Sequence, residues 1–386
     1  MESYFLSICL IAVGSAFLAW AACRFRQPIL IGYFLCGVIL GHQCLDLVTD
    51  THLLREISHI GITLLLFLAG LVLHPDRFLK YFKIATVVTV GGAAISCMMV
   101  FAYLFLAGYT AVESLVVGLA LMFSSTILVI KLLPTTTLHQ RHMGSICIAV
   151  LIAQDVLAVI AIMFVGLKPE ESIWQFILLL NLKVLLLIIA AMIFERYIMR
   201  RMMQSVDRYT EVLLMLCLGW CMGIAALAHY FGISYEIGAF IAGIIMARSK
   251  IAYVISEKLQ PMRDFFLMFF FFVLGAGFDF TKMEGIWPYA IVLGALIICL
   301  RPVCMKYLMQ FMGEQKRFST EMGFRLGQAS EFALILAFAA EESGRLTLAT
   351  VHLIQVTTII TMIISSYIIV FKYPTPIGTL EKLKKD

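Results

Sequence analysis

The stretch GSICIAVLIAQDVLAVIAIMFVGL, residues 144–167, carries a single formal charge, that of Asp155. An apolar run of about 20 residues crosses the hydrocarbon core of a bilayer as a helix. A carboxylate inside such a run is costly, and an intramembrane acidic residue usually has a partner or a function. The stretch therefore predicts a membrane-spanning helix with a functional residue near its middle.

The composition of the whole chain agrees with this stretch. Of the 386 residues, 62% are hydrophobic and 14% are charged, and the mean hydropathy is +0.98. Apolar runs recur along nearly the entire chain, which is typical of proteins that cross the membrane several times. A soluble domain cannot hide so much apolar surface. Residues 1–386 are therefore predicted to form one all-α polytopic transport domain in the lipid bilayer.

Several other classes of protein are excluded. The chain contains no G-x-G-x-x-G or G-x-x-x-x-G-K-[ST] pattern, so no nucleotide-binding fold is indicated. Its ten cysteines include no C-x-x-C pair, which argues against a zinc site and a disulfide framework. The net charge of +5 comes from loops and does not indicate a nucleic-acid partner. We expect neither an enzyme nor a resident cofactor.

Thirteen spans are predicted. They cover residues 3–23, 28–44, 57–73, 84–108, 112–133, 144–167, 172–194, 210–230, 233–247, 262–280, 286–310, 321–342 and 347–371. When the loops are assigned alternately to two sides, 22 of the 29 Lys and Arg residues fall on one side and four on the other. The remaining three lie within spans. Because basic loops stay in the cytoplasm, this split predicts an outside N-terminus and a cytoplasmic C-terminus.

The chain contains an internal repeat. GYFLCGVILG (32–41) aligns without gaps with GAFIAGIIMA (238–247), and FLAGLVLH (67–74) aligns with FVLGAGFD (272–279). The offsets are 206 and 205, and the repeated spans lie seven apart, which gives them opposite orientations. We predict a six-plus-six inverted repeat around a linker helix at 172–194, an architecture found in transporters. The same glycines also suit close helix packing.

Four spans place polar residues near one depth. These residues are Ser124, Ser125 and Thr126 of span five, Gln154 and Asp155 of span six, Arg301 of span eleven, and Gln328, Ser330 and Glu331 of span twelve. A carboxylate can hold either a cation or a proton, so Asp155 could couple the fluxes of the two. Hydroxyls and backbone carbonyls would supply further oxygen ligands, because broken helices are tolerated where they line a cavity.

Each of these residues also has a simpler interpretation. Arg301 stays charged and could balance Asp155 or Glu331, or it could form a purely structural pair. Ser and Thr in membrane helices often bond only to backbone carbonyls. Gln154 lies on a different helix face from its neighbour Asp155, so a packing or gating role competes with direct binding of an ion.

At these residues the chain resembles the membrane domain of Kef-type glutathione-regulated potassium efflux proteins, in the second monovalent cation:proton antiporter family. Four stretches carry the resemblance: GYFLCGVILG, ALMFSSTILVI, IAVLIAQDVLAVI and GQASEFALIL. It implies a sodium/proton antiporter-like fold with two crossed broken helices, at Ser124–Thr126 and Gln328–Glu331. It also implies that Asp155 binds K⁺ or Na⁺ in competition with H⁺, opposite the basic residue Arg301. The Gln154–Asp155 pair favours K⁺, because relatives selective for sodium typically carry other pairs there.

The resemblance further implies an assembly. It predicts a homodimer in the bacterial inner (plasma) membrane, with spans 1–3 and 8–10 as dimerisation part and spans 4–6 and 11–13 as ion-binding core. Kef proteins continue into a cytoplasmic nucleotide-binding regulatory domain that is absent from this chain, so regulation by such a domain or by an ancillary subunit is not assigned. Relatives also tend to have an acidic residue after the glycine of span three, where this chain has Leu71–Leu73 after Gly70.

Three functions remain open from the sequence. The first is a secondary transporter that exchanges K⁺, or possibly Na⁺, for H⁺ by alternating access. The second is a K⁺ channel-like efflux protein that uses the same site, although no T-V-G-Y-G-like filter is present. The third is a non-transporting membrane subunit in which Asp155 and Arg301 are structural.

Overall fold

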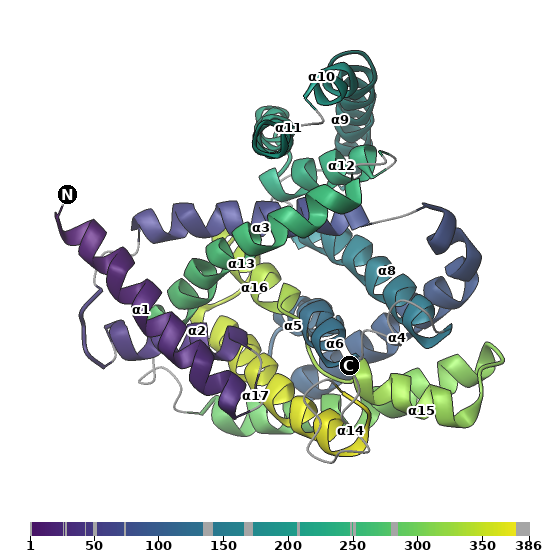
Figure 1. Ribbon diagram of the computed structural model, residues 1–386. Helices are drawn as coiled ribbons and strands as arrows, with labels where there is room; N and C mark the ends of the chain where they lie inside the picture. The colour runs from purple at the N-terminus through teal and green to yellow at the C-terminus, as the bar shows by residue number, and fades with distance from the viewer. Residues whose placement is uncertain are drawn as a thin grey trace. The chain divides into compact units, whose positions relative to one another are not determined.

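The computed structural model describes residues 2–375 except 26, 28, 43, 49–51, 73–74, 134–141, 166–172, 207–208, 248, 250–251 and 279–284. Helices form its architecture (Figure 1). They are α1 (Glu2–Arg24), α2 (Ile29–Leu40), α3 (His52–Val72), α4 (Pro75–Leu106), α5 (Ala111–Leu121), α6 (Thr126–Leu132), α8 (His142–Val165), α9 (Ile173–Phe194), η1 (Glu195–Met199), α10 (Arg200–Ser205), α11 (Thr210–Tyr230), α12 (Tyr235–Met246), α13 (Ala252–Ala276), α14 (Trp287–Phe311), α15 (Lys316–Arg325), α16 (Phe332–Glu342) and α17 (Leu348–Lys372).

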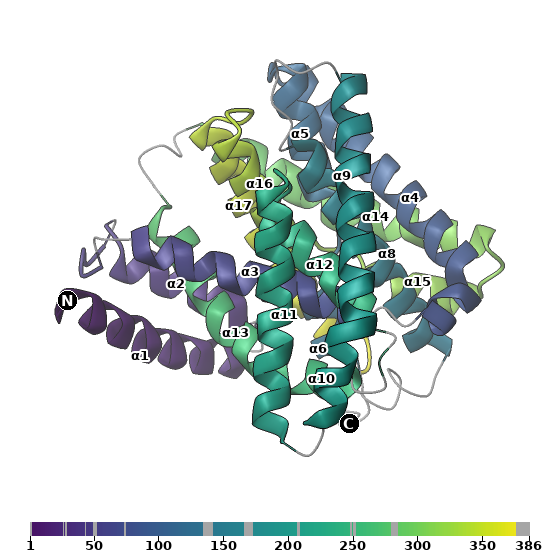
Figure 2. The same ribbon diagram turned by 90° about the horizontal axis from the view of Figure 1, so that it is seen from above.

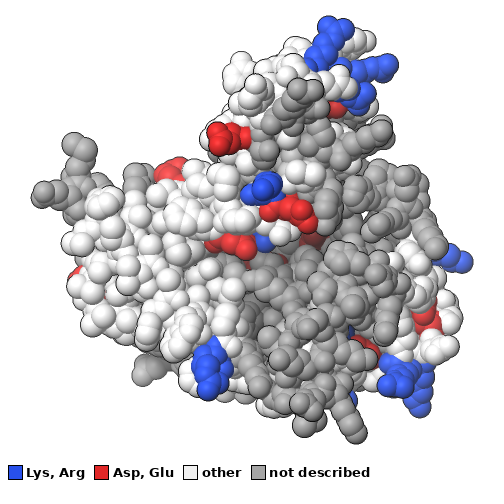
Figure 3. Space-filling view, in the orientation of Figure 1, with Lys and Arg blue, Asp and Glu red and all other residues white. Residues whose placement is uncertain are grey.

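The fold is that of an all-helical polytopic membrane protein. In the described part of the chain, seven helices are long and apolar enough to cross a membrane, and four more are apolar but shorter. Every predicted span coincides with a helix or with a pair of helices. The exposed side of α1 is apolar, as expected of a helix that faces lipid. Its exposed side chains, each more than 60% exposed, include Phe5, Val13, Phe17 and Trp20. Figure 3 shows little charge over this helix.

Two predicted spans are interrupted. Span 112–133 divides into α5 and α6 around residues 122–125, and span 321–342 divides into α15 and α16 around residues 326–331. We call these two segments the first break and the second break. They fall where the hydroxyls of Ser124–Thr126 and the polar run Gln328–Glu331 led us to expect irregular backbone. Figure 1 shows α5, α6, α16 and α17 gathered in one part of the structure.

Several helices continue beyond the predicted spans. The linker helix was expected to end at 194, but it runs on through the π-helical turn η1 into α10 and ends at Ser205. Likewise α4 begins at Pro75 rather than 84, and α13 begins at Ala252 rather than 262. The apolar run ends at the membrane surface, whereas the hydrogen bonds of a helix do not require an apolar environment. Figure 2 shows α9 and α11 running lengthwise beside one another.

The contacts of the chain form two compact units. The first comprises Met1–Leu47, Leu79–Gly166 and Gly275–Asp386, and the second comprises Val48–Phe78 and Leu167–Leu274. The predicted dimerisation part and ion-binding core describe assembly and movement rather than contacts, and that division stays a prediction. Both breaks and the residues that hold them belong to the first unit.

One helix contact occurs twice. In the second unit, a Cβ built on Gly70 would lie 2.4 Å from the carbonyl oxygen of Phe240. In the first unit, a Cβ built on Gly275 would lie 2.0 Å from the carbonyl oxygen of Phe34. Gly70 and Gly275 are matched by the repeat, and so are Phe34 and Phe240. Only glycine permits such an approach of two backbones. The repeated glycines therefore pack corresponding helices: α3 against α12, and α13 against α2.

Candidate ion-binding site

The carboxylate of Asp155 lies at the start of the second half-helix of the first break. Asp155 belongs to α8 and is 7% exposed. Its Oδ1 accepts a hydrogen bond of 3.2 Å from the hydroxyl of Thr126, the first residue of α6. A buried carboxylate beside a hydroxyl provides oxygen ligands for a hard monovalent cation, and the same carboxylate can take a proton instead.

The side chain of Gln154 supports the first break. Its Oε1 accepts a bond of 3.0 Å from the backbone N–H of Ser124, and its Nε2 donates to the Ser124 hydroxyl at 3.4 Å. The Ser124 N–H lies beyond the end of α5, where no helical partner is available. These contacts favour the packing role for Gln154 over direct binding of an ion.

The three hydroxyls of the first break have three different partners. Ser124 donates to the carbonyl oxygen of Leu326 in the second break at 2.7 Å. Ser125 accepts from the N–H of Leu128 at 3.1 Å and so caps α6, as serine commonly does at the start of a helix. Thr126 alone of the three contacts Asp155. The sequence predicts the same role in ion binding for all three hydroxyls, whereas in the structure each of them has a different partner.

The second break is held by α17. The backbone N–H of Ala329 donates to the Thr361 hydroxyl at 3.1 Å, and the Ser365 hydroxyl donates to Oε1 of Gln328 at 3.1 Å. Neither Thr361 nor Ser365 was singled out from the sequence, because a threonine or serine in an apolar helix has no signature of its partner.

The remaining residues of the second break bond locally. Ser330 accepts from the N–H of Phe332 at 3.2 Å and donates to Glu331 at 3.4 Å. Glu331 is buried as well. The structure thus brings the candidate residues of spans five, six and twelve together around one region of the first unit.

Arg301 joins the two breaks. Its side chain is 1% exposed and lies on α14. One terminal nitrogen donates to the carbonyls of Phe123, at 3.1 Å, and of Gln328, at 2.9 Å; the other donates to the carbonyl of Leu121. Its Nε donates to the hydroxyl of Ser96 at 3.3 Å. None of these four bonds reaches Asp155, so the role of charge partner stays a prediction, and its observed task is to satisfy carbonyls that the breaks leave free.

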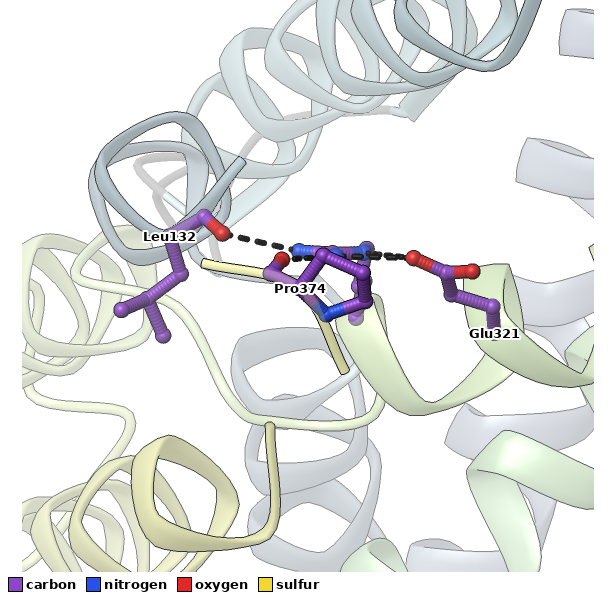
Figure 4. A network of polar contacts seen from close by, with 4 residues as sticks. Leu132, Glu321 and Pro374 are labelled. Atoms are coloured by element: carbon purple, nitrogen blue, oxygen red, sulfur yellow. Dashed lines mark hydrogen bonds and ion pairs between the residues drawn. The ribbon is translucent and has the colours of Figure 1, made fainter. Parts of the chain in front are cut away.

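A second buried arginine bonds the far end of α6. Arg325, at the end of α15, pairs with Glu321 at 2.8 Å and donates to the carbonyls of Leu132 and Pro374 at 2.9 and 2.8 Å. Figure 4 shows these three partners converging on one point. Because Leu132 ends α6 and Pro374 follows α17, the network fixes three chain segments.

No group of three or more His, Cys, Asp and Glu that could hold a metal ion occurs in the described residues.

The chain matches a known protein family over most of its length. The family model described as "Sodium/hydrogen exchanger, transmembrane" matches residues 12–372. The chain belongs to the sodium/hydrogen exchanger family. It is thus a member of a family of cation:proton antiporters and not an enzyme, and the resemblance carried by the four sequence stretches is confirmed.

The relatives of this exchanger family member include potassium-efflux proteins. It is 30% identical, over 355 residues, to the glutathione-regulated potassium-efflux system protein KefC of Shigella flexneri serotype 5b (strain 8401). It is also 30% identical, over 356 residues, to KefC of Escherichia coli O81 (strain ED1a). Each match covers 88% of this chain and 56% of the relative, so the chain spans little more than half the length of these proteins.

The fold matches a solved antiporter. The structure of the sodium proton antiporter MjNhaP1 from Methanocaldococcus jannaschii at pH 8 aligns with a TM-score of 0.73 at 15% identity, covering 94% of this chain and 95% of that one. A map of the same antiporter aligns with a TM-score of 0.62 at 13% identity, covering 96% and 93%. At this identity the match establishes the fold of the exchanger family member and not its ion.

Proposed function

We propose that this protein is a secondary transporter that exchanges K⁺ for H⁺ across the membrane by alternating access. Asp155 binds either the cation or the proton, and the competition between the two couples their movements. K⁺ is the proposed cation because the relatives at 30% identity are potassium-efflux proteins. Na⁺ is the ion against which K⁺ must be ranked.

One observation carries the proposal. The carboxylate of Asp155 is buried within a helix of a membrane protein and accepts a hydrogen bond from Thr126, where α6 begins after a break in its span. Broken helices at mid-membrane are where transporters bind their ions, because the free backbone and the hydroxyls there replace water around the ion.

The repeated helix contact supports an inverted repeat. We propose thirteen spans, in two sets of six on either side of the linker helix, with the two breaks in corresponding spans. The matched contacts Gly70–Phe240 and Gly275–Phe34 are what a repeated structural unit would produce. In such transporters the two repeats form the site between them and exchange its access from one side to the other.

The assembly is also a proposal. The basic loops favour an outside N-terminus and a cytoplasmic C-terminus in the bacterial inner membrane. Several of those loop residues, among them Lys382, Lys384 and Lys385, lie outside the described residues. We propose a homodimer through spans 1–3 and 8–10, with the core of spans 4–6 and 11–13 carrying the ion. A single cation or proton on Asp155 favours one-for-one, electroneutral exchange.

Purified protein in proteoliposomes tests the proposal. A gradient of K⁺ or Na⁺ is imposed, and the internal pH is followed with a fluorescent dye. We expect either gradient to move protons in the opposite direction, with K⁺ effective at the lower concentration and no net current. The exchange proposal is wrong if neither ion moves protons. The ion assignment alone is wrong if Na⁺ is the more effective of the two.

A further inference from the structure

Two neighbouring residues of the second broken span bond to the two ends of α6. The carbonyl oxygen of Leu326 accepts a hydrogen bond of 2.7 Å from the hydroxyl of Ser124, two residues before α6 begins. The guanidinium of Arg325 donates to the carbonyl oxygen of Leu132, the last residue of α6, at 2.9 Å. A helix from Thr126 to Leu132 is only about 9 Å long, so two adjacent residues can bond to both of its ends.

The side chain of Arg325 is itself held in one orientation. It is 1% exposed, and its Nε and one terminal nitrogen donate to Oε1 of Glu321 at 3.0 and 2.8 Å. The same terminal nitrogen donates to the carbonyl oxygen of Pro374 at 2.8 Å, where the chain leaves α17. The central carbon of the guanidinium lies over the ring of Tyr373, 6.0 Å from its centroid. A planar group bonded to partners in this way can hold the end of α6 in one place (Figure 4).

The other end of α6 reaches the ion site. Thr126 is the first residue of α6, and its hydroxyl donates to Oδ1 of Asp155 at 3.2 Å. The backbone N–H of Val129 donates to the carbonyl of Ser125 at 3.3 Å, so hydrogen bonding within the helix begins just before Thr126. A hydrogen bond weakens steeply when its donor turns away from the acceptor. We therefore expect a shift of the Leu132 end of α6 to weaken the bond between Thr126 and Asp155.

We propose that Arg325 is a positioning residue for the ion site and acts on it through α6. Its bonds go to Glu321, Leu132 and Pro374, so Arg325 is not a ligand of the ion. Apolar contacts support the same arrangement, because α6 and the end of α17 share a buried cluster of Leu128, Leu132, Ile369 and Val370. The proposal rests on the proposed exchange at Asp155, and it adds a residue that sets the cation affinity of that site.

A double-mutant cycle in proteoliposomes tests the proposal by K⁺-driven exchange. Thr126→Val removes the hydroxyl that Arg325 is proposed to position. Arg325→Met should shift the half-maximal K⁺ concentration in the same direction as Thr126→Val, by up to about the same fivefold factor. In the double variant, Arg325→Met should add little further change, because the hydroxyl is already absent. Arg317→Met, in the exposed first turn of α15, is the control and should keep the half-maximal concentration of the parent.

Two results of this cycle would overturn the proposal. Arg325 is merely structural if Arg325→Met lowers the maximal rate or the stability and leaves the half-maximal K⁺ concentration unchanged. Arg325 acts independently of Thr126 if the shifts of the two single variants multiply in the double variant. Arg325→Lys takes the place of Arg325→Met if the methionine variant does not fold, since lysine keeps the charge but cannot reproduce the fork of the guanidinium.

The same cycle can be measured on the melting temperature in detergent. Thr126→Val should lower the melting temperature less in an Arg325→Met background than in the parent, because the bond to Asp155 is already weakened there. Equal decreases in both backgrounds would contradict the proposal, since substitutions at distant sites that are not coupled are additive. This measurement needs no transport. Absence of K⁺-driven exchange in the parent would therefore refute the exchange proposal alone, and additive melting temperatures would refute the role of Arg325 alone.

Discussion

The hydroxyl of Ser124 donates a 2.7 Å hydrogen bond to the carbonyl oxygen of Leu326, which lies 202 residues further along the chain. This bond connects the two breaks directly, and Arg301 connects them a second time through the carbonyls of Phe123 and Gln328. The breaks therefore form one bonded unit rather than two independent interruptions. We therefore expect a change at one break to affect the other, and to affect Asp155 through its hydrogen bond with Thr126 at the first break.

Loss of the direct bond between the breaks should slow transport. Ser124→Ala removes the donor to Leu326 and leaves a buried carbonyl without it, at a cost of about 1–3 kcal/mol. We expect the maximal exchange rate to fall several-fold, with little change in the cation concentration for half-maximal rate, because Ser124 does not contact Asp155. Exchange kinetics in proteoliposomes separate these two quantities. A change confined to the half-maximal concentration would instead make Ser124 a ligand of the ion.

The Thr126 hydroxyl should act on ion affinity. Thr126→Val removes the hydrogen bond to Asp155, and a bond worth about 1 kcal/mol corresponds to roughly a fivefold change in an equilibrium constant. We expect the half-maximal cation concentration to change by about that factor, whereas Thr126→Ser, which keeps the hydroxyl, should resemble the parent. Equal effects of the valine and serine variants would mean that the methyl group, and not the hydroxyl, is what matters.

Arg301 should be essential to the fold around the breaks. Arg301→Met leaves three buried carbonyls without their donor, and we expect a loss of about 3 kcal/mol or more in the free energy of unfolding. Arg301→Lys should recover only part, because an ammonium cannot reproduce the planar fork of the guanidinium. Arg200→Met is the control, since the Arg200 side chain is 54% exposed and makes a single ion pair with Glu195 at 3.4 Å, and an ion pair that reaches the surface contributes little. Denaturant unfolding in detergent measures all three.

If Arg301→Met unfolds no more easily than Arg200→Met, its bonds to the breaks are not structural. The role of charge partner for Asp155 would then be the better account. Retention of wild-type stability together with loss of proton coupling would support it.

The repeated glycine contact predicts that alanine substitutions at two glycines have opposite effects on stability. Gly275→Ala places a methyl against the Phe34 carbonyl and should destabilise the protein by about 1–3 kcal/mol. Gly219, on α11, has no atom within 4 Å of an added Cβ. Gly219→Ala should therefore stabilise by up to about 1 kcal/mol, the helix propensity difference. Equal melting temperatures for the two variants would contradict the close approach at Gly275.

Much of the architecture follows from hydropathy alone. The apolar runs locate the helices, and the polar clusters at Ser124–Thr126 and Gln328–Glu331 locate both breaks, because such groups are tolerated at mid-membrane only where the backbone is irregular or bonded. The extensions of α4 and α13, and the continuation of α9 into α10, could not be predicted in this way. Hydropathy reports the membrane boundary, and a helix continues through it wherever the sequence permits.

The partners within the site were beyond the sequence. Arg301 and Asp155 both stand out as intramembrane charges, and opposite charges invite pairing. The structure gives Arg301 backbone carbonyls as partners instead. Every residue has a backbone carbonyl, so the sequence does not show which of them accept hydrogen bonds from Arg301. The Leu326 carbonyl was missed for the same reason, whereas Thr361 and Ser365 were missed because a hydroxyl in an apolar helix does not show its partner. For Gln154 the sequence does not decide between packing and ion binding. Its position next to Asp155 places it on another helix face, but the sequence does not show which residues lie against that face.

The most direct test of the central claim compares the parent protein with Asp155→Asn in proteoliposomes, with Glu341→Gln on the exposed end of α16 as control. In the parent and in Glu341→Gln, a K⁺ gradient should drive protons, and the half-maximal K⁺ concentration should rise as the pH falls, because protons compete for the same carboxylate. Asparagine has similar shape but neither binds a proton nor carries charge. We predict that Asp155→Asn folds and moves no protons in response to K⁺ at any pH; exchange at the rate of the parent would contradict the account.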